Sequence, residues 1–204
     1  MGLRRPPSRR MVSPVMSSLL SIHTYGDPVL RESSRPVDAI TPDILALIED
    51  MFATMKANQG VGLAAQQVGR TESVCVIELP ESYDREEETG PRLNPDVPLR
   101  LALVNPRIVE ASDDTCSLEE GCLSFPGITG SVERSWSVTI EHLGLDGQPR
   151  TTTLQGFFAR AAQHEMDHLA GDLFIDRFSH VKKLAVRGKL KRLQQETREH
   201  LAAG

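Results

Sequence analysis

The chain has 204 residues, of which 39% are hydrophobic, and it carries 23 lysines and arginines against 28 acidic residues. This length and composition fit one globular domain with short appendages, and three cysteines without CxxC spacing exclude a disulfide framework. No apolar run approaches the roughly 18 residues of a membrane span, and one Trp, two Tyr and six Phe are too few for a base-stacking surface, so neither a membrane nor DNA is expected as a partner.

The net charge of −5 is unevenly distributed along the chain. Residues 1–26 contain four arginines and no acid, and residues 181–204 contain seven basic and two acidic residues. The acidic excess therefore belongs to residues 27–180. Basic ends beside an acidic body indicate either contact with a polyanion or tails that are only solvated, and composition leaves both readings open.

The N-terminal residues 1–18 are rich in Arg, Ser and Pro and show no hydrophobic periodicity. We expect a disordered extension that lies outside the packed fold. The segment lacks the apolar core of a secretory signal, which favours a cytoplasmic protein, although an acid-free leader rich in Arg and Ser leaves an organelle transit peptide as the alternative.

The first regular element is predicted at residues 42–58. Thr41 is a good N-cap, Pro42 suits the first helical position, and apolar residues follow at helical spacing. Residues 73–79 are rich in β-branched side chains and predict a buried strand, with Cys75 as a small core residue. The next stretch, 80–98, combines four prolines with a run of acids and predicts a solvated loop.

The second half of the chain alternates strand and helix signals without a regular βαβ pattern. Strands are expected at 101–110, 132–142 and 150–154, the last two joined through the Gly-rich turn 144–147. Helices are expected at 157–169 and 181–201. We therefore predict an α+β fold in which antiparallel strands pack around a central helix, followed by a basic C-terminal helix spanning residues 181–204.

The sharpest motif, HEMDH, lies on the predicted helix 157–169. His164 and His168 are four residues apart and share a helix face, so both imidazoles can converge on one metal ion while Glu165 reaches its open position. Phe157 and Ala161 lie on the same face, which directs the histidines toward the core. The alternative is a pair of core histidines satisfied by hydrogen bonds.

A third metal ligand is needed to make this motif decisive. Phe174 stands where metzincin proteases have their third histidine, and phenylalanine cannot ligate. The downstream acids Glu196 and Glu199 belong to the basic terminal helix, a poor place for a ligand. Cys122, in a turn-rich stretch, is a candidate thiolate that would complete a His₂Cys site, although taken alone it could be an inert buried thiol.

Three segments together resemble the peptide deformylase family. Residues 60–67 read GVGLAAQQ and resemble its GxGxAAxQ motif, residues 120–124 read EGCLS, and residues 163–168 read QHEMDH, its QHExDH motif. All three occur in the family's order, and the similarity extends over about residues 19–180, which we take as the catalytic domain.

The resemblance implies an enzyme that hydrolyses the N-formyl group from the formyl-methionine of nascent polypeptides and releases formate. Its partners would be N-formylmethionyl peptides. It also implies one divalent metal ion per chain held by Cys122, His164 and His168, with Fe²⁺ the usual physiological ion and Zn²⁺ or Ni²⁺ able to substitute. Such an ion lowers the pKa of its bound water.

The other family positions carry over residue by residue. Glu165 would take the proton of the attacking water and deliver it to the leaving amine. The Gln67 side-chain amide and the Leu123 backbone N–H would stabilise the oxyanion. Gly60 and Gly62 would let an extended peptide backbone approach, the alternative for Gly60 being a simple helix stop.

Further expectations concern the surroundings of the site. Glu120 and Arg134 are either an ion pair that steadies the metal loop or ordinary surface charges. Asp167 is either a further group that supports the metal site or a solvated helix residue. Phe157 and Ala161 are expected to line the pocket for the methionine side chain. A ribosome contact through RNA is expected on the basic residues of the C-terminal helix, Lys182, Lys183, Arg187, Lys189, Lys191 and Arg192.

Two other functions were compatible with parts of the pattern. A zincin-type endopeptidase shares HExxH, but the missing third histidine speaks against it. A catalytically silent ribosome-binding protein would be free to lose the site residues, yet Gln67, Cys122 and the whole HEMDH motif are intact.

Overall fold

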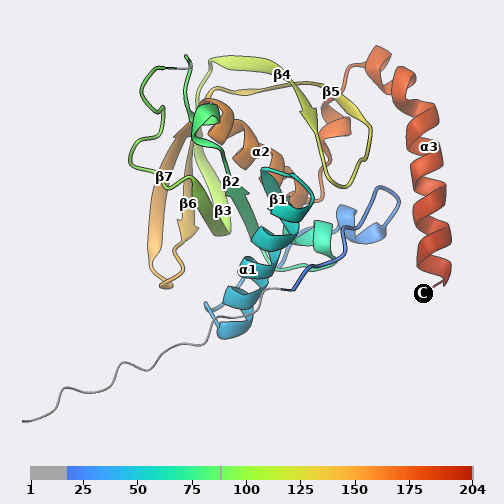
Figure 1. Cartoon of the computed structure of the whole chain (residues 1–204), viewed down its shortest axis with the longest axis horizontal. Helices are drawn as coiled ribbons and strands as arrows, with labels where there is room; N and C mark the ends of the chain where they lie inside the picture. The colour runs from blue at the N-terminus through green and yellow to red at the C-terminus, as the bar shows by residue number, and fades with distance from the viewer. Residues whose placement is uncertain (1–17, 88, 204) are drawn as a thin grey trace, which may run out of the picture.

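The computed structural model describes residues 18–87 and 89–203, so all of the predicted N-terminal extension except Ser18 lies outside the described residues. The helices are α1 (Pro42–Ala57), α2 (Gly156–Ala170) and α3 (His180–Ala203), with short 3₁₀ helices η1 (Pro28–Arg31), η2 (Ala65–Val68), η3 (Glu81–Asp84) and η4 (Phe174–Arg177). The strands are β1 (Gly62–Ala64), β2 (Val74–Glu78), β3 (Arg100–Ala111), β4 (Thr115–Gly121), β5 (Thr129–Ser135), β6 (Ser137–Leu143) and β7 (Pro149–Gln155) (Figure 1).

The main sheet is antiparallel and has the strand order β1-β2-β3-β6-β7. Its strand β2 alternates between two cores: Cys75 and Ile77 pack into the cluster that contains α2, whereas Val74 and Val76 pack into the cluster that contains α1. Both faces of β2 are therefore covered, which explains its continuous apolar sequence. The α+β fold with antiparallel strands around the HExxH helix is confirmed, as is the burial of Cys75.

Helix α1 begins as its sequence predicts. The Thr41 hydroxyl accepts a hydrogen bond from the Ile44 N–H at 3.3 Å, and Pro42 occupies the first turn, where a missing N–H costs nothing. The apolar face of the helix is buried against β1 and β2. This packing places the start of β1 directly beyond the end of α1.

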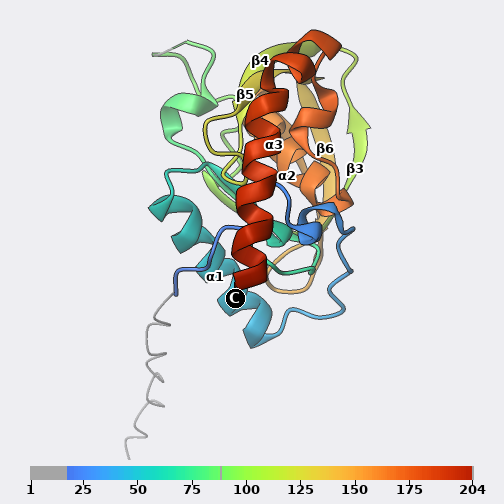
Figure 2. The same ribbon diagram turned by 90° about the vertical axis from the view of Figure 1, so that its right-hand side faces the viewer.

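A third core cluster joins α3 to the rest of the molecule. Val186 and Leu193 of α3 pack with a group of aromatic and aliphatic side chains that includes Phe125, Phe174 and Phe178. The Thr197 hydroxyl lies 2.6 Å from that of Thr24. Helix α3 therefore runs along one side of the domain with one face packed and the other exposed (Figure 2). None of the described helices is long and apolar enough to cross a bilayer.

The prediction of a single strand at 132–142 is wrong. The segment divides at Trp136 into β5, which pairs with β4 in a separate two-stranded sheet, and β6, which pairs with β3 and β7. The Trp136 N–H donates to the Asp114 carbonyl, and the Trp136 carbonyl accepts the Gly156 N–H. Its backbone therefore takes no part in the strand pairing of either sheet. The predicted hairpin through the turn 144–147 is confirmed, with Leu143 opposite Pro149.

The prediction of a solvated loop at 80–98 is also wrong in part. Residues Glu81–Asp84 form η3, and the side chains of Asp84 and Asn94 are buried. The Asp84 carboxylate accepts hydrogen bonds from Arg92 Nε at 2.7 Å and from the Asn94 amide. A buried charge is tolerable because these partners compensate its lost hydration. The short strand β1 and the strand β4 were not predicted at all.

Candidate metal centre and active site

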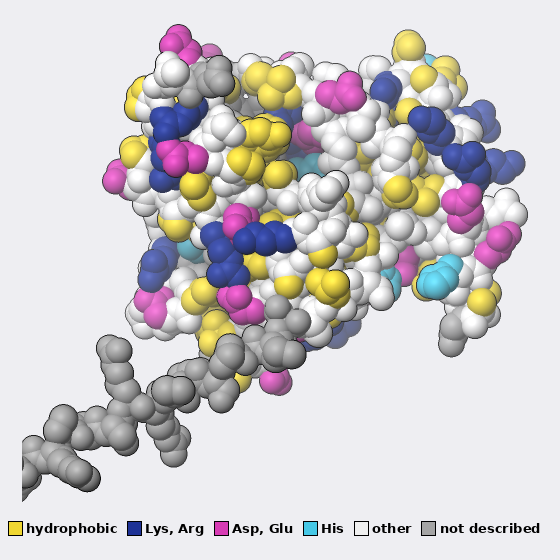
Figure 3. All heavy atoms as spheres, in the orientation of Figure 1, with side chains coloured by type: hydrophobic (Ala, Val, Ile, Leu, Met, Phe, Trp, Pro, Cys, Tyr) yellow, Lys and Arg dark blue, Asp and Glu magenta, His cyan; other side chains and the backbone are white. Residues whose placement is uncertain are grey.

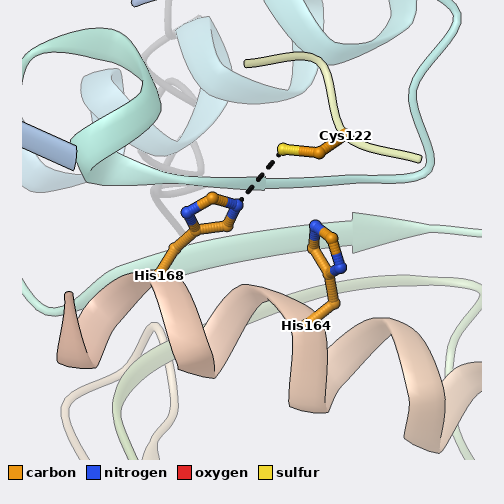
Figure 4. Close-up of side chains that lie close together, drawn as sticks. All are labelled: Cys122, His164 and His168. Carbon is orange, nitrogen blue, oxygen red and sulfur yellow. Dashed lines mark hydrogen bonds between the residues drawn. The ribbon is translucent and has the colours of Figure 1, made fainter. Parts of the chain in front are cut away.

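Helix α2 carries the two histidines through the middle of the molecule. It starts at Gly156 and ends at Ala170, and Gly171, with a φ of 81°, caps its end. His164 and His168 lie one turn apart with ring centroids separated by 5.2 Å, and both are buried. Figure 4 shows both imidazoles projecting from the same side of α2 toward Cys122.

Cys122 occupies the turn that follows β4, where the Phe125 N–H bonds to its carbonyl at 2.9 Å. The Cys122 Sγ lies 3.3 Å from His168 Nε2, and one ligand atom from each of the three residues lies within 4.8 Å of the others. Among residues 18–87 and 89–203, this is the one group of three His, Cys, Asp or Glu residues with that geometry. Two imidazoles and a thiolate suit a borderline divalent metal ion.

The two histidines differ in their affinity for protons. Burial lowers the pKa of His164, but hydrogen bonds with Cys122 and Glu120 outweigh it and raise that pKa to about 10, so this imidazole must release a proton when a metal ion binds. His164 Nδ1 lies 2.9 Å from Glu120 Oε2, which leaves its Nε2 as the ligand atom. Burial, assisted by the neighbouring His164, lowers the pKa of His168 well below its ordinary value, so its imidazole stays neutral and keeps a lone pair. Phe174 packs against the His164 ring at 5.6 Å between centroids and takes no ligand position.

Glu120 anchors this arrangement through a buried ion-pair network. Arg134 donates to both of its oxygens, at 2.7 and 2.9 Å, so the predicted ion pair exists and is buried. Arg134 also bonds to Asp167 at 2.8 Å, which places Asp167 in the same network. Burial opposes ionisation of Glu120, but hydrogen bonds from His164 and Arg134 outweigh it and lower the pKa of Glu120 to about 2.

Sequence reasoning missed Arg160, a further member of the network. Its guanidinium donates to Glu120 Oε1 at 2.6 Å, to the Val132 carbonyl at 2.9 Å and to the Cys116 carbonyl. It therefore ties α2 to β4 and β5. One signal was available: Arg160 is four residues before His164, on the buried face of an otherwise apolar helix turn.

Glu165 lies in the same buried region. Burial raises the pKa of its carboxyl to about 7, although His164 and Arg134 act in the opposite direction. Its Oε2 is buried and has no hydrogen-bond partner among the described residues. A carboxylate with one unengaged oxygen and a pKa near neutrality is suited to exchanging protons with a water molecule.

Gly62 is what makes room for this carboxylate. A Cβ atom built on Gly62 would lie 2.8 Å from Glu165 Cδ and closer still to Oε1. A Cβ on Gly60 would meet Leu123 Cδ1 at 2.8 Å. Both glycines thus bring the backbone next to site residues, but the close contact at Gly62 is with Glu165 itself.

Gln67 is held in one orientation by its surroundings. Its Oε1 accepts the Ala64 N–H at 2.8 Å, so its Nε2 faces Cys122 Sγ and Ser124 Oγ, each at 3.3 Å. Leu123 follows Cys122 in the turn, and its N–H donates to no acceptor in the part of the chain that the structure describes. A fixed amide donor therefore faces the Cys122 sulfur, and the Leu123 N–H belongs to the next residue of the same turn.

These residues surround a cavity of about 520 Å³. Its walls include Phe157 and Ala161 from α2, the two residues expected to line a methionine pocket, together with residues 58–62 beside β1 and residues 119–123 around Cys122. Apolar walls with a polar, titratable floor are typical of a substrate site. The structure thus brings Gly60, Gly62, Gln67, Cys122, Leu123, His164 and Glu165 to one cavity, with His168 in contact with Cys122.

Comparisons with known proteins all point to one family. The model of the polypeptide deformylase family matches residues 19–184. A peptide deformylase from Brachyspira hyodysenteriae is 40% identical over 173 residues, which cover 85% of this chain and 88% of the relative. One from Acinetobacter baumannii is 39% identical over 186 residues, covering 91% of this chain and 98% of the relative.

Solved structures give the same result. A peptide deformylase from Plasmodium falciparum superposes with a TM-score of 0.77 and 36% identity, covering 88% of this chain and 98% of its own. A class I type b peptide deformylase from Acinetobacter baumannii with Met-Ala-Ser bound gives a TM-score of 0.70 at 37% identity, covering 80% and 100%. The chain therefore belongs to the peptide deformylase family, metal-dependent hydrolases that remove the formyl group from the N-terminal methionine of nascent polypeptides.

Proposed function

We propose that this chain deformylates peptides with Cys122, His164 and His168 as the ligands of a divalent ion, Fe²⁺ in the cell and replaceable by Zn²⁺ or Ni²⁺. The observation that carries the proposal is the meeting of these three donors beside a buried glutamate, at a cavity that Cys122, His164 and Glu165 line. A bound ion of this kind lowers the pKa of a coordinated water toward neutrality. The remaining chemistry belongs to the side chains around it.

Glu165 acts as the general base and then as the general acid. Its unengaged Oε2 receives the proton of the attacking water and later delivers it to the amine that leaves. When the C–N bond of the formamide breaks, the methionine nitrogen departs with that proton and formate remains. The pKa of about 7 supports this exchange near neutral pH.

Gln67 and Leu123 stabilise the negative charge that develops on the formyl oxygen. The Gln67 Nε2 is fixed by the Ala64 contact, and the Leu123 N–H is fixed by the turn after Cys122, so neither donor reorganises during the reaction. The methionine side chain enters the cavity between Phe157 and Ala161. Because β1 is an edge strand, its backbone from Gly62 is available to an extended peptide, and Gly60 lies in the segment that leads into it.

Replacing Cys122 with alanine tests the metal assignment. With one of three ligands removed, the metal content of protein purified without oxygen should fall well below one ion per chain, and formate release from formyl-Met-Ala-Ser should fall with it. Cys116→Ala is the matched control because Cys116 contributes only its backbone carbonyl to the site. An unchanged metal-to-protein ratio in Cys122→Ala would remove Cys122 from the ligand set.

We propose that the enzyme works in the cytoplasm and contacts the ribosome. The exposed face of α3 supports the ribosome contact. Lys183, Arg187, Lys191 and Arg198 are exposed and fall within about 80° of one another around the helix. Figure 3 shows Lys and Arg side chains gathered over α3. Such a stripe can neutralise RNA phosphates and would bind RNA in a salt-dependent way.

Charge reversal tests this contact better than truncation, because α3 also buries Val186 and Leu193 in the core. The pair Arg187→Glu with Lys191→Glu should lower co-sedimentation with ribosomes at low salt by about tenfold. The control pair, Arg107→Glu with Arg150→Glu, changes the net charge by the same amount on another surface and should leave co-sedimentation unaltered. Equal co-sedimentation of both double variants would contradict the ribosome contact while leaving the deformylase activity untouched.

A further inference from the structure

The loop at residues 80–98 is fastened to the start of the helix that carries the histidines. Asn94 Oδ1 accepts the Gln155 N–H at 2.8 Å, and Asn94 Nδ2 donates to the Gln155 carbonyl at 3.2 Å. Gln155 immediately precedes α2. The loop is closed on itself by the Leu93 N–H, which donates to the Asp84 carbonyl at 2.7 Å. Its position relative to the active site is therefore fixed.

A second contact strengthens this attachment. Gly156 has a φ of 60°, and a Cβ there would lie 2.7 Å from Leu93 Cδ1, so the loop packs directly on the first residue of α2. The buried Asp84 carboxylate holds Arg92 and Asn94 from inside the loop. A buried charge is costly unless hydrogen bonds compensate its lost hydration, and because Arg92 and Asn94 supply them, residues 81–84 and 92–94 are held together beside α2.

Tyr83 is the residue that this loop presents. Its ring lies 5.2 Å from that of Phe157 at an interplanar angle of 78°, and 49% of its surface is exposed. Phe157 lines the catalytic cavity. The apolar surface of the cavity therefore continues outward from Phe157 onto Tyr83, and Figure 3 shows hydrophobic side chains gathered on this face beside a hollow in which a histidine is visible.

The geometry of an extended peptide indicates what would cover this surface. Side chains i and i+2 of an extended chain point to the same side and are about 7 Å apart, whereas residue i+1 points away. With methionine in the cavity, the side chain of the third substrate residue lies on the same side, about 7 Å farther along the peptide. We propose that Tyr83, packed on Phe157, binds an apolar or aromatic side chain at the third position of the substrate and so determines specificity beyond methionine. This inference rests on the proposed function.

The test compares two formylated peptides on wild-type and variant enzyme. Wild-type protein should deformylate formyl-Met-Ala-Phe with a kcat/KM about fivefold above that for formyl-Met-Ala-Ser, mainly through KM, as expected for an aromatic pair. Tyr83→Ala should bring this ratio close to one, and Tyr83→Phe, which keeps the ring, should restore it. Leu145→Ala, an equally exposed apolar residue in the β6–β7 turn, should leave the ratio at its wild-type value.

The position of the effect along the peptide is part of the prediction. Moving the phenylalanine to the second position, in formyl-Met-Phe-Ser, should make the enzyme insensitive to Tyr83→Ala. A Phe-to-Ser ratio that survives in Tyr83→Ala, or that falls equally in Leu145→Ala, would overturn the proposal. Failure of the wild-type enzyme to release formate from any of the three peptides would instead overturn the proposed function.

Discussion

Glu165→Ala protein should bind its metal ion normally and release essentially no formate from formyl-Met-Ala-Ser. The carboxylate is not among the three metal donors, so the site that holds the ion is preserved. What is lost is the group that accepts and returns the proton, which contributes typically 10²- to 10⁴-fold to such reactions. The measurements are elemental analysis and a formate-release assay on the same preparation.

Glu165→Gln provides the second arm of this experiment. Glutamine keeps the size of the side chain and fits the buried space beside Gly62, but it cannot accept a proton at neutral pH. It should therefore be as inactive as alanine while unfolding closer to the wild-type temperature. Turnover in Glu165→Gln above about one-tenth of the wild-type rate would exclude Glu165 as the proton carrier.

Gly62→Ala should be nearly as damaging, although it adds only one methyl group. The new Cβ would overlap the Glu165 carboxylate, and Glu165 is buried, so it cannot swing into solvent. Displacing a catalytic group by about 1 Å can cost about 10²-fold in rate. We expect kcat for formyl-Met-Ala-Ser to fall by about this factor while the metal content stays at one ion per chain.

The control for this substitution is Gly188→Ala on α3, where an added Cβ meets no atom within 4 Å. It should leave kcat at the wild-type value. The split between kcat and KM distinguishes a clash from a lost backbone contact to the substrate. A fall in kcat with KM unchanged indicates the clash with Glu165, whereas a rise in KM with kcat unchanged would assign the effect of Gly62 to substrate binding.

The sequence predicted best what depends on local spacing. His164 and His168 share a buried helix face because residues four apart must do so, and the turn 144–147 joins its strands because the glycine positions permit it. The turn-rich context of Cys122 made it only a candidate for the third ligand, and the family resemblance is what assigned it. Nothing in the local pattern of residues 116–124 required that turn to meet α2.

The features that were missed depend on partners distant in the chain. Trp136 interrupts a continuous strand pattern because Asp114 and Gly156 take its backbone bonds, and no Gly or Pro marks the division. In the sequence, Asp84 is one of several acids in a segment that predicts a solvated loop, yet its carboxylate is buried because Arg92 and Asn94 donate hydrogen bonds to it. Arg160 likewise acquires its role from Glu120, forty positions earlier. Tertiary hydrogen bonds of this kind leave no periodic signal.

The separate origin of the donor atoms has a consequence for stability. Cys122 belongs to the turn after β4, whereas both histidines belong to α2, so an ion held by all three would cross-link segments about forty residues apart. A ligand that binds only the folded chain at 1,000 times its Kd adds about 4 kcal/mol to the free energy of unfolding. The catalytic ion would then also stabilise the folded chain, because it would hold the β4–β5 hairpin against α2 for as long as it stays bound.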